Sequence, residues 1–213
     1  MALLFKHTDS LWGVWKLEET SDELFALLNN KEVYLSQLEQ IHSESRRKEW
    51  LACRVLLQEF VDSSVYIAYH ANGAPYLINS SLFISISHTK GYVTVLLQEH
   101  PAVGIDIEYY SNRVQKIRAR FMNEEEENAL DQKNEIEHLL LYWCAKEALF
   151  KMIRQNEVDF REHLHVTPFT YDSEGCFCVQ ETRTEKREKY NMKFYVQPEF
   201  VVVYSSPKSK KEN

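Results

Sequence analysis

The sequence predicts an α+β fold built from two similar halves. Helical patterns and then strand patterns occur before residue 103, and the same order follows it. With 213 residues, 44% of them hydrophobic, the chain is long enough for two small domains. We expect residues 1–102 and 103–206 to form two α+β halves, a pseudo-dimer packed around a central cleft. We expect residues 207–213 to form a polar tail.

Composition excludes several classes of function. A net charge of −7 argues against a dedicated nucleic-acid binder, which would have to neutralise phosphates. No apolar run approaches the ~18 residues needed to span a membrane, and Met1–Lys6 does not resemble a signal peptide. The four cysteines show no CxxC spacing, which favours reduced thiols. We therefore expect a soluble, cytoplasmic protein. We also expect it to act as a monomer.

The first half begins with two strand patterns, continues with helical patterns and ends in a predicted β meander. The expected strands are Leu3–Lys6 and Leu11–Leu17. Helices are expected from Ser21, over Val33–Ile41 and over Ser45–Val61. The meander is expected over Val65–Tyr69, Pro75–Ile78, Leu82–Ser87 and Tyr92–Gln98.

Two places in this half carry candidate ligand-binding side chains. The third helix starts with Arg46, Arg47 and Lys48, and Arg54 follows one to two turns later. Cations at a helix start oppose the helix dipole, so they indicate either an anionic ligand or a solvated basic face. The strand that contains Ser87 ends at His88, where a ligand contact and a structural role are both open.

The second half begins with the strand Val103–Glu108, the most informative stretch of the chain. Side chains alternate along a strand, so Asp106 and Glu108 lie on one face. Two neighbouring carboxylates repel unless a positive charge lies between them, which indicates a bound cation. Oxygen ligands favour Mg²⁺, Mn²⁺ or Ca²⁺. A strand with one solvated face is the alternative.

The remaining elements are two short helical stretches, one long helix and further strands. A helix is expected over Arg113–Phe121, and Asn123 with Glu126 predicts a capping box at the start of another. The long helix is expected over Glu135–Ile153, where Glu147 and Lys151 could form a surface ion pair. Strands are expected over His165–Asp172, Cys176–Thr182, Lys189–Val196 and Phe200–Tyr204.

Three stretches together resemble the Sfp-type 4′-phosphopantetheinyl transferases. They are Gly104-Ile105-Asp106-Ile107-Glu108, the helical motif Trp143-Cys144-Ala145-Lys146-Glu147-Ala148-Leu149-Phe150-Lys151, and Ile86-Ser87-His88-Thr89. Their order and spacing agree with the family over essentially the whole chain. The resemblance implies the phosphopantetheinyl transferase fold and an enzyme that transfers 4′-phosphopantetheine from coenzyme A to a serine of an acyl or peptidyl carrier protein. The expected products are the holo-carrier and adenosine 3′,5′-bisphosphate.

The resemblance also implies a role for each site residue. Asp106, Glu108 and Glu147 are expected to bind Mg²⁺, and Glu147 is the candidate base for the carrier serine. Lys146 and Lys151 are expected to stabilise phosphate oxygens.

The phosphates of CoA are expected to contact a second set of residues. This set comprises Ser87, His88, Arg47 and Arg54, with Arg46 or Lys48 as substitutes because the register of the cations is open. We expect the carrier protein to bind near Arg113, Lys116, Arg118 and Arg120.

One departure and two alternatives accompany this interpretation. Ala74 lies between Gly73 and Pro75, where many members of the family have lysine, so one expected CoA-binding cation is missing. Lys90 is a candidate to compensate for it. The alternatives are a non-catalytic relative that binds CoA or a carrier, and another Mg²⁺-dependent enzyme that cleaves a pyrophosphate.

Overall fold

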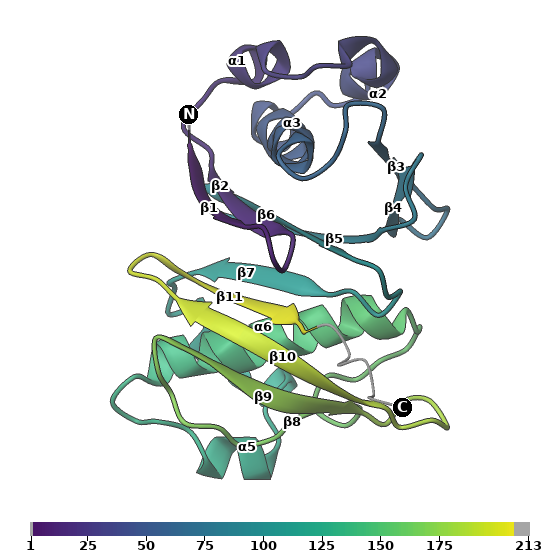
Figure 1. Cartoon of the computed structure of the whole chain (residues 1–213). Helices are drawn as coiled ribbons and strands as arrows, with labels where there is room; N and C mark the ends of the chain where they lie inside the picture. Colours follow the sequence, from purple (N-terminus) through teal and green to yellow (C-terminus); the bar gives the residue numbers. More distant parts are fainter. Residues whose placement is uncertain (1, 207–213) are drawn as a thin grey trace. The chain divides into compact units, whose positions relative to one another are not determined.

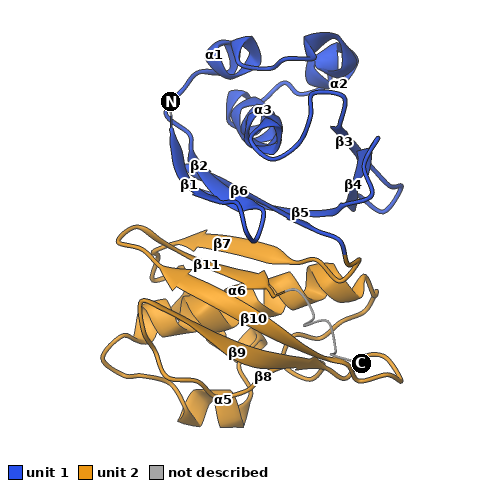
Figure 2. Ribbon diagram, viewed as in Figure 1, with its two compact units in different colours: residues 1–99 blue, residues 100–213 orange. Residues whose placement is uncertain are grey.

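The computed structural model describes residues 2–206, so the expected tail at 207–213 lies outside the described residues. The fold is mixed α+β with three sheets, and it divides into two compact units, Met1–Glu99 and His100–Asn213 (Figure 2). Within residues 2–206, no helix combines the length and apolar character needed to cross a membrane. Cys53, Cys144, Cys176 and Cys178 are free thiols, as expected.

Unit 1 is built on an antiparallel four-stranded sheet in the order β1-β2-β6-β5. Its strands are β1 (Leu3–His7), β2 (Trp12–Lys16), β5 (Phe83–Thr89) and β6 (Tyr92–Gln98). Helix α3 (Glu44–Gln58) lies against one face of this sheet (Figure 1). The core between them contains Leu51 and Leu56 of the helix and Val93 and Val95 of β6, all buried. This packing fixes the end of α3 that carries the basic residues.

The remaining elements of unit 1 are short. They are α1 (Ser21–Ala26), η1 (Lys31–Tyr34), α2 (Leu35–Glu39), β3 (Tyr66–Tyr69) and β4 (Pro75–Ile78). Strands β3 and β4 pair only with each other, whereas β5 and β6 belong to the main sheet, so the prediction of a single meander is wrong. Asn79 directly after β4 has a positive φ of 61°, and the chain leaves the extended conformation there.

Unit 2 is built on a five-stranded antiparallel sheet in the order β7-β11-β10-β9-β8. Its strands are β7 (Ile105–Tyr109), β8 (Leu164–Val166), β9 (Glu174–Glu181), β10 (Lys189–Val196) and β11 (Phe200–Ser205). Helix α6 (Glu135–Ile153) packs against this sheet, with most contacts to β11 and β7 (Figure 1). The predicted bounds of α6 are confirmed. β8 is shorter than the strand expected over His165–Asp172.

Three short helical segments lie between β7 and α6. They are α4 (Arg113–Ile117), η2 (Arg118–Arg120) and α5 (Glu124–Asn128). The capping box at the start of α5 is confirmed, because the Asn123 side chain accepts from the Glu126 amide and the Glu126 carboxylate accepts from the Asn123 amide. Each contact satisfies an amide that the helix itself leaves without a partner.

Candidate active site

A glycine allows strand β7 and helix α6 to approach closely. A Cβ atom on Gly104 would collide with the backbone oxygen of Ala148 and would lie 2.7 Å from Cγ of Met152. Any other residue at this position would therefore push the strand away from the helix. Ala148 directly follows Glu147, so the contact places the carboxylate-bearing residues of β7 beside the polar face of α6.

The polar side chains of β7 and α6 contact one another. Nζ of Lys151 donates to Oδ1 of Asp106 at 2.7 Å and to the backbone oxygen of Ile105 at 3.0 Å. Nε1 of Trp143 donates to Oε1 of Glu108 at 3.2 Å. Trp143, Glu147 and Lys151 are spaced four residues apart, which places them on one helix face. The ion pair of Lys151 is with Asp106 on the strand, and not with Glu147 on its own helix.

The carboxyl of Glu147 has a pKa well above its usual range. Burial raises the pKa of its carboxyl to about 7, and the carboxylate of Asp106 adds to the rise. Lys151 opposes the rise, and Glu108 again adds to it. Glu147 is thus close enough to both carboxylates of β7 to feel their charge, and it titrates near neutral pH.

A pocket of about 610 Å³ lies within unit 2 beside these residues. Its acidic side is formed by Glu108, Glu147 and Asp159, and Arg113 and Arg120 also line it. The apolar lining comprises Val114, Ile117, Leu140, Trp143, Val158 and Phe160. The pocket can therefore hold a ligand that has both an apolar part and a group that interacts with carboxylates.

The carboxylates of this site are the ligand type that divalent cations prefer, but their side chains do not form a complete metal site in residues 2–206. Asp106, Glu108 and Glu147 offer oxygen donors only, and their mutual repulsion, which contributes to the raised pKa of Glu147, is relieved by a positive charge. Lys151 is the cation that pairs with Asp106 in the structure. With the side chains in these positions, residues 2–206 contain no three His, Cys, Asp or Glu residues grouped so that they could hold a metal ion.

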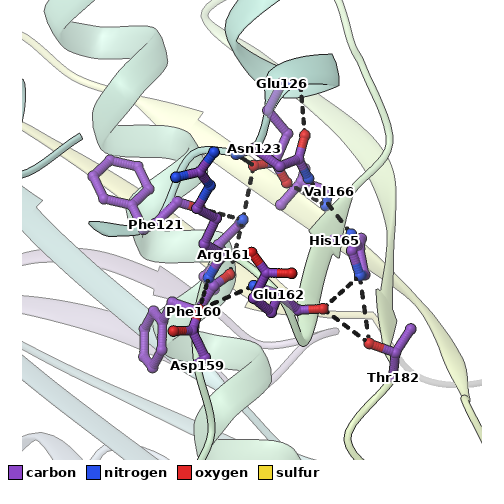
Figure 3. A network of polar contacts seen from close by, with 11 residues as sticks. Phe121, Asn123, Glu126, Asp159, Phe160, Arg161, Glu162, His165, Val166 and Thr182 are labelled. Carbon is purple, nitrogen blue, oxygen red and sulfur yellow. Dashed lines mark hydrogen bonds and ion pairs between the residues drawn. The ribbon is translucent and has the colours of Figure 1, made fainter. Parts of the chain in front are cut away.

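Lys146 occupies a different place from the one expected for a phosphate-binding residue. Its side chain is fully buried, and Nζ donates to Oε2 of Glu126 at 2.7 Å and to the backbone oxygens of Phe121 and Phe160. Glu126 in turn accepts from the amides of Asn123 and Val166 (Figure 3). We call this set of contacts the Lys146–Glu126 brace.

The brace connects α6 to the wall of the pocket. Phe160 lines the pocket, and its ring lies 5.6 Å from the ring of Trp143. The centres of the Phe121 and Trp143 rings lie 5.2 Å apart. Because Nζ of Lys146 contacts the backbone oxygens of both phenylalanines, it supports the positions of the rings that pack on Trp143.

A second pocket, of about 320 Å³, lies within unit 1. Nη1 of Arg46 lies 3.0 Å from Nε2 of His88 and 3.0 Å from Oε2 of Glu49. These three residues line the pocket with Trp50, Tyr69, Gly73 and Pro75. Arg46 and His88 are both exposed, so the pocket presents polar and cationic groups beside two aromatic rings.

The other expected CoA-binding residues lie elsewhere in unit 1. Arg54 is buried, its guanidinium lies 3.2 Å from the centre of the Trp50 ring, and Nη1 donates to the backbone oxygen of Trp50. Arg47 is half-buried and donates to the backbone oxygen of Ile41. Ser87 is buried and lies on the opposite face of β5 from its neighbour His88. The arginine that the structure places beside His88 is therefore Arg46, which the sequence offered as a substitute for Arg47 or Arg54.

Several residues of the two pockets were not expected from the sequence. Asp159 and Phe160 lie in an irregular segment after α6, and no periodic pattern points to them. The sequence could have predicted that Lys146 lies on a different helix face from Glu147 and Lys151. Consecutive residues are about 100° apart around a helix, so Lys146 points away from Glu147. Trp143 is on the Glu147 face for the same reason.

Comparison with known families bears on unit 2. Residues 102–203 match the family model of the 4′-phosphopantetheinyl transferase superfamily. A comparison with curated proteins gave no match. The matched residues include β7 and α6 and the whole lining of the larger pocket. The carboxylate site therefore lies within the residues that are similar to the 4′-phosphopantetheinyl transferase superfamily.

Proposed function

We propose that the protein is an Sfp-type 4′-phosphopantetheinyl transferase. It transfers 4′-phosphopantetheine from CoA to a serine of an acyl or peptidyl carrier protein and releases adenosine 3′,5′-bisphosphate. The observation that carries the proposal is the close packing of Gly104 on Ala148, which gathers Asp106, Glu147 and Lys151 beside a pocket. The superfamily match over the same residues supports it.

The reaction is a displacement at phosphorus. The serine oxygen forms a bond to the phosphorus that carries pantetheine, and the bond from that phosphorus to the oxygen of the adenosine bisphosphate breaks. Glu147 accepts the serine proton. The pKa of the metal-free Glu147 carboxyl is raised to about 7, and a bound divalent cation would lower this pKa and favour the carboxylate that accepts the proton. The electron pair of the broken bond leaves with the adenosine bisphosphate.

The other residues of the site hold and neutralise the reacting groups. A divalent cation bound by Asp106, Glu108 and Glu147 would neutralise charge on the pyrophosphate and hold it beside the serine. Lys151 is only partly buried and can reach a phosphate oxygen when it leaves Asp106. Trp143 fixes the Glu108 carboxylate through its indole N–H. Lys146 acts as a positioning residue through its brace.

We assign the pocket of unit 1 to the nucleotide end of CoA. Arg46 and His88 offer donors to a phosphate, and Trp50 and Tyr69 offer aromatic faces near them. Gly73 and Pro75 line this pocket on either side of Ala74 in sequence, where the family's lysine is missing. Arg46 supplies a cation from α3 in its place.

The carrier protein is proposed to bind at the basic residues between β7 and α5. Arg113, Lys116 and Arg120 are exposed, whereas Arg118 is held by Glu127 and Glu135. Because carriers are acidic, reversing the charge of Arg113 and Lys116 together is expected to raise KM for the carrier about tenfold and leave KM for CoA unchanged. Steady-state assays with each substrate varied check this, and a change confined to CoA contradicts it.

Intact mass spectrometry of apo carrier proteins tests the function directly. Several carriers are incubated with the protein, CoA and Mg²⁺, and each is examined for the phosphopantetheine mass increment. Glu147→Gln and a sample with EDTA are expected to lose the increment. Glu137→Gln, which changes a carboxylate in the first turn of the same helix, is the matched control and keeps the activity.

The same experiment separates the alternatives. CoA binding without any increment identifies a non-catalytic relative that binds CoA or a carrier. Hydrolysis of ATP that does not depend on CoA identifies a different Mg²⁺-dependent enzyme that cleaves a pyrophosphate. An absence of both CoA binding and increment contradicts the proposed function.

A further inference from the structure

The turn between β3 and β4 contains Asn72 followed by Gly73, and Asn72 is the one asparagine in the sequence that precedes a glycine. Both residues are exposed. Glycine carries no Cβ, so its backbone nitrogen is the least hindered neighbour that an asparagine side chain can have. The surroundings add no hindrance, because a Cβ atom at Gly73 would have no heavy atom within 4 Å beyond its chain neighbours. The Gly73 nitrogen therefore has a sterically open approach to the Asn72 amide.

Three hydrogen bonds hold this turn closed. The amide of Gly73 donates to the backbone oxygen of His70 at 2.9 Å, and the amide of His70 donates to the backbone oxygen of Ala74 at 2.9 Å. The side-chain oxygen of Asn72 accepts from the amide of Ala74 at 3.1 Å. The first of these bonds occupies the N–H group of Gly73. The turn must therefore open before the Gly73 nitrogen can react.

The strands on either side of the turn give it little protection against opening. Among the described residues, β3 and β4 pair only with each other (Figure 1). A two-stranded ribbon is marginally stable in water, and exposed turns open at a low free-energy cost. Ile67 of β3 and Leu77 of β4 are buried in the core of unit 1, whereas the turn beyond them is exposed. Opening of the turn therefore does not require unfolding of the unit.

We propose that Asn72 is a site of spontaneous deamidation that lowers the affinity of the unit 1 pocket for CoA. The Gly73 nitrogen loses its proton and forms a bond to Cγ of Asn72. The bond from Cγ to Nδ2 breaks, and the released amide group takes up that proton and leaves as ammonia. Water then opens the cyclic imide at either of its carbonyl groups, which gives aspartate or isoaspartate. The reaction needs no co-reactant besides water.

Both products change the surroundings of the pocket. Gly73 and Pro75 line it together with Arg46 and His88. A carboxylate at position 72 is adjacent in sequence to this lining and opposes the attraction of Arg46 for a phosphate. Isoaspartate also adds one atom to the main chain before Gly73, so the hydrogen bonds of the turn can no longer all form. This consequence rests on the proposed function, because it needs CoA in the pocket.

The first test follows the modification itself. Purified protein is kept at mildly alkaline pH and digested, and mass spectrometry measures the conversion of the Asn72 amide to an acid. Asn79 is the internal control, because it is exposed, lies directly after β4 and precedes a serine. Asn79 should convert about tenfold more slowly, since the Cβ of serine hinders the attack. Conversion of Asn72 that is no faster than that of Asn79 overturns the proposal.

The second test asks whether the turn and the pocket are coupled. Saturating CoA should slow the conversion of Asn72 about threefold, because a ligand that binds only the closed turn disfavours the open one. By calorimetry, Asn72→Asp should bind CoA about twofold more weakly than Asn72→Ser, which replaces the same side chain without adding charge. Equal CoA affinity of the two variants overturns the proposal, and so does a conversion rate that CoA leaves unchanged.

The two tests separate this inference from the proposed function. Conversion of Asn72 is measured by mass and needs no ligand. If the unmodified chain binds no CoA, the proposed function is wrong, and the effect on CoA affinity fails with it. If CoA binds equally well to Asn72→Asp and Asn72→Ser, the proposed function stands and this inference alone fails.

Discussion

The pockets of the two units differ in charge and in the way their polar groups are held. In unit 2 the charged lining comprises three carboxylates and two guanidinium groups, and buried contacts of Lys146 fix part of the surrounding backbone; these lining residues are Glu108, Glu147, Asp159, Arg113 and Arg120. In unit 1 the lining carries Arg46 and His88, both exposed, and Glu49, which lies within ion-pair distance of both. We call the pocket of unit 2 the acidic pocket, because carboxylates are the larger part of its charged lining, and this suits a cation and reaction chemistry. We call the pocket of unit 1 the basic pocket, because Arg46 and His88 suit the binding of phosphate. Variants can break or sharpen this contrast.

The largest expected effect comes from breaking the Lys146–Glu126 brace. Lys146→Met leaves the buried Glu126 carboxylate without its cation, and we expect a loss of about 3–5 kcal/mol in the free energy of unfolding. Urea denaturation measures the loss. The double variant Lys146→Met with Glu126→Gln should lose less than the sum of the single variants, because no charge is then left buried alone. Additive losses would contradict the pairing.

The next effect is the pH dependence that Glu147 gives to the stability of the acidic pocket. In the metal-free protein the folded state holds a proton on Glu147 up to about pH 7, whereas the unfolded chain releases it near 4.5. The contribution of this proton to the free energy of unfolding is therefore fully present below pH 4.5. It is lost as the pH rises through 7, which lowers the free energy of unfolding by up to about 3 kcal/mol. Unfolding of Glu147→Gln in EDTA should show less of this loss than the unmodified chain.

Glu137→Gln is the control for the pH profile, because it changes a carboxylate on the same helix that is not among the groups that shift the pKa of Glu147. Its profile should follow that of the unmodified chain. If Glu147→Gln also follows that profile between pH 4.5 and 8, Glu147 does not hold a proton in the folded state, and the electrostatic account of the acidic pocket is wrong.

A smaller effect is expected in the basic pocket. Arg46→Gln should raise KM for CoA about tenfold and leave kcat nearly unchanged, because a charge-assisted hydrogen bond to phosphate is lost. Arg47→Gln is the control, because the Arg47 guanidinium contacts the backbone oxygen of Ile41. Steady-state kinetics with CoA and with dephospho-CoA measure the difference. If Arg46 binds the 3′-phosphate, the variant should discriminate less between the two substrates.

The contrast between the pockets was only partly accessible from the sequence. Strand alternation places Asp106 and Glu108 on one face, and helical spacing places Glu147 and Lys151 on another, so the acidic pocket was predictable in its main residues. Gly104 is explained only by the structure, because the collision with Ala148 depends on how α6 crosses β7. Phe160 comes from an irregular segment, where position is set by tertiary contacts and not by periodicity.

The brace and the basic pocket show the same limit. Glu126 was predicted as a helix cap, and it is one, yet its ion pair with Lys146 joins residues 20 positions apart and has no local pattern. Arg46, Arg47 and Arg54 are the same residue type on the same helix, α3, so residue type alone does not tell them apart. Their burial differs because Leu51 and Leu56 turn the helix toward the sheet, which leaves Arg46 exposed and encloses Arg54.

The smallest expected effect would sharpen the contrast by adding charge to the basic pocket. Ala74 lies in the turn between β3 and β4, and its neighbours Gly73 and Pro75 line the pocket. Ala74→Lys is expected to lower KM for CoA about threefold, because a solvent-exposed lysine adds a modest attraction for phosphate. Ala71→Lys adds the same charge to the same turn at an exposed position outside the lining, and it should leave KM unchanged. An equal fall in KM for both variants would show that net charge, and not position in the pocket, controls CoA binding in unit 1.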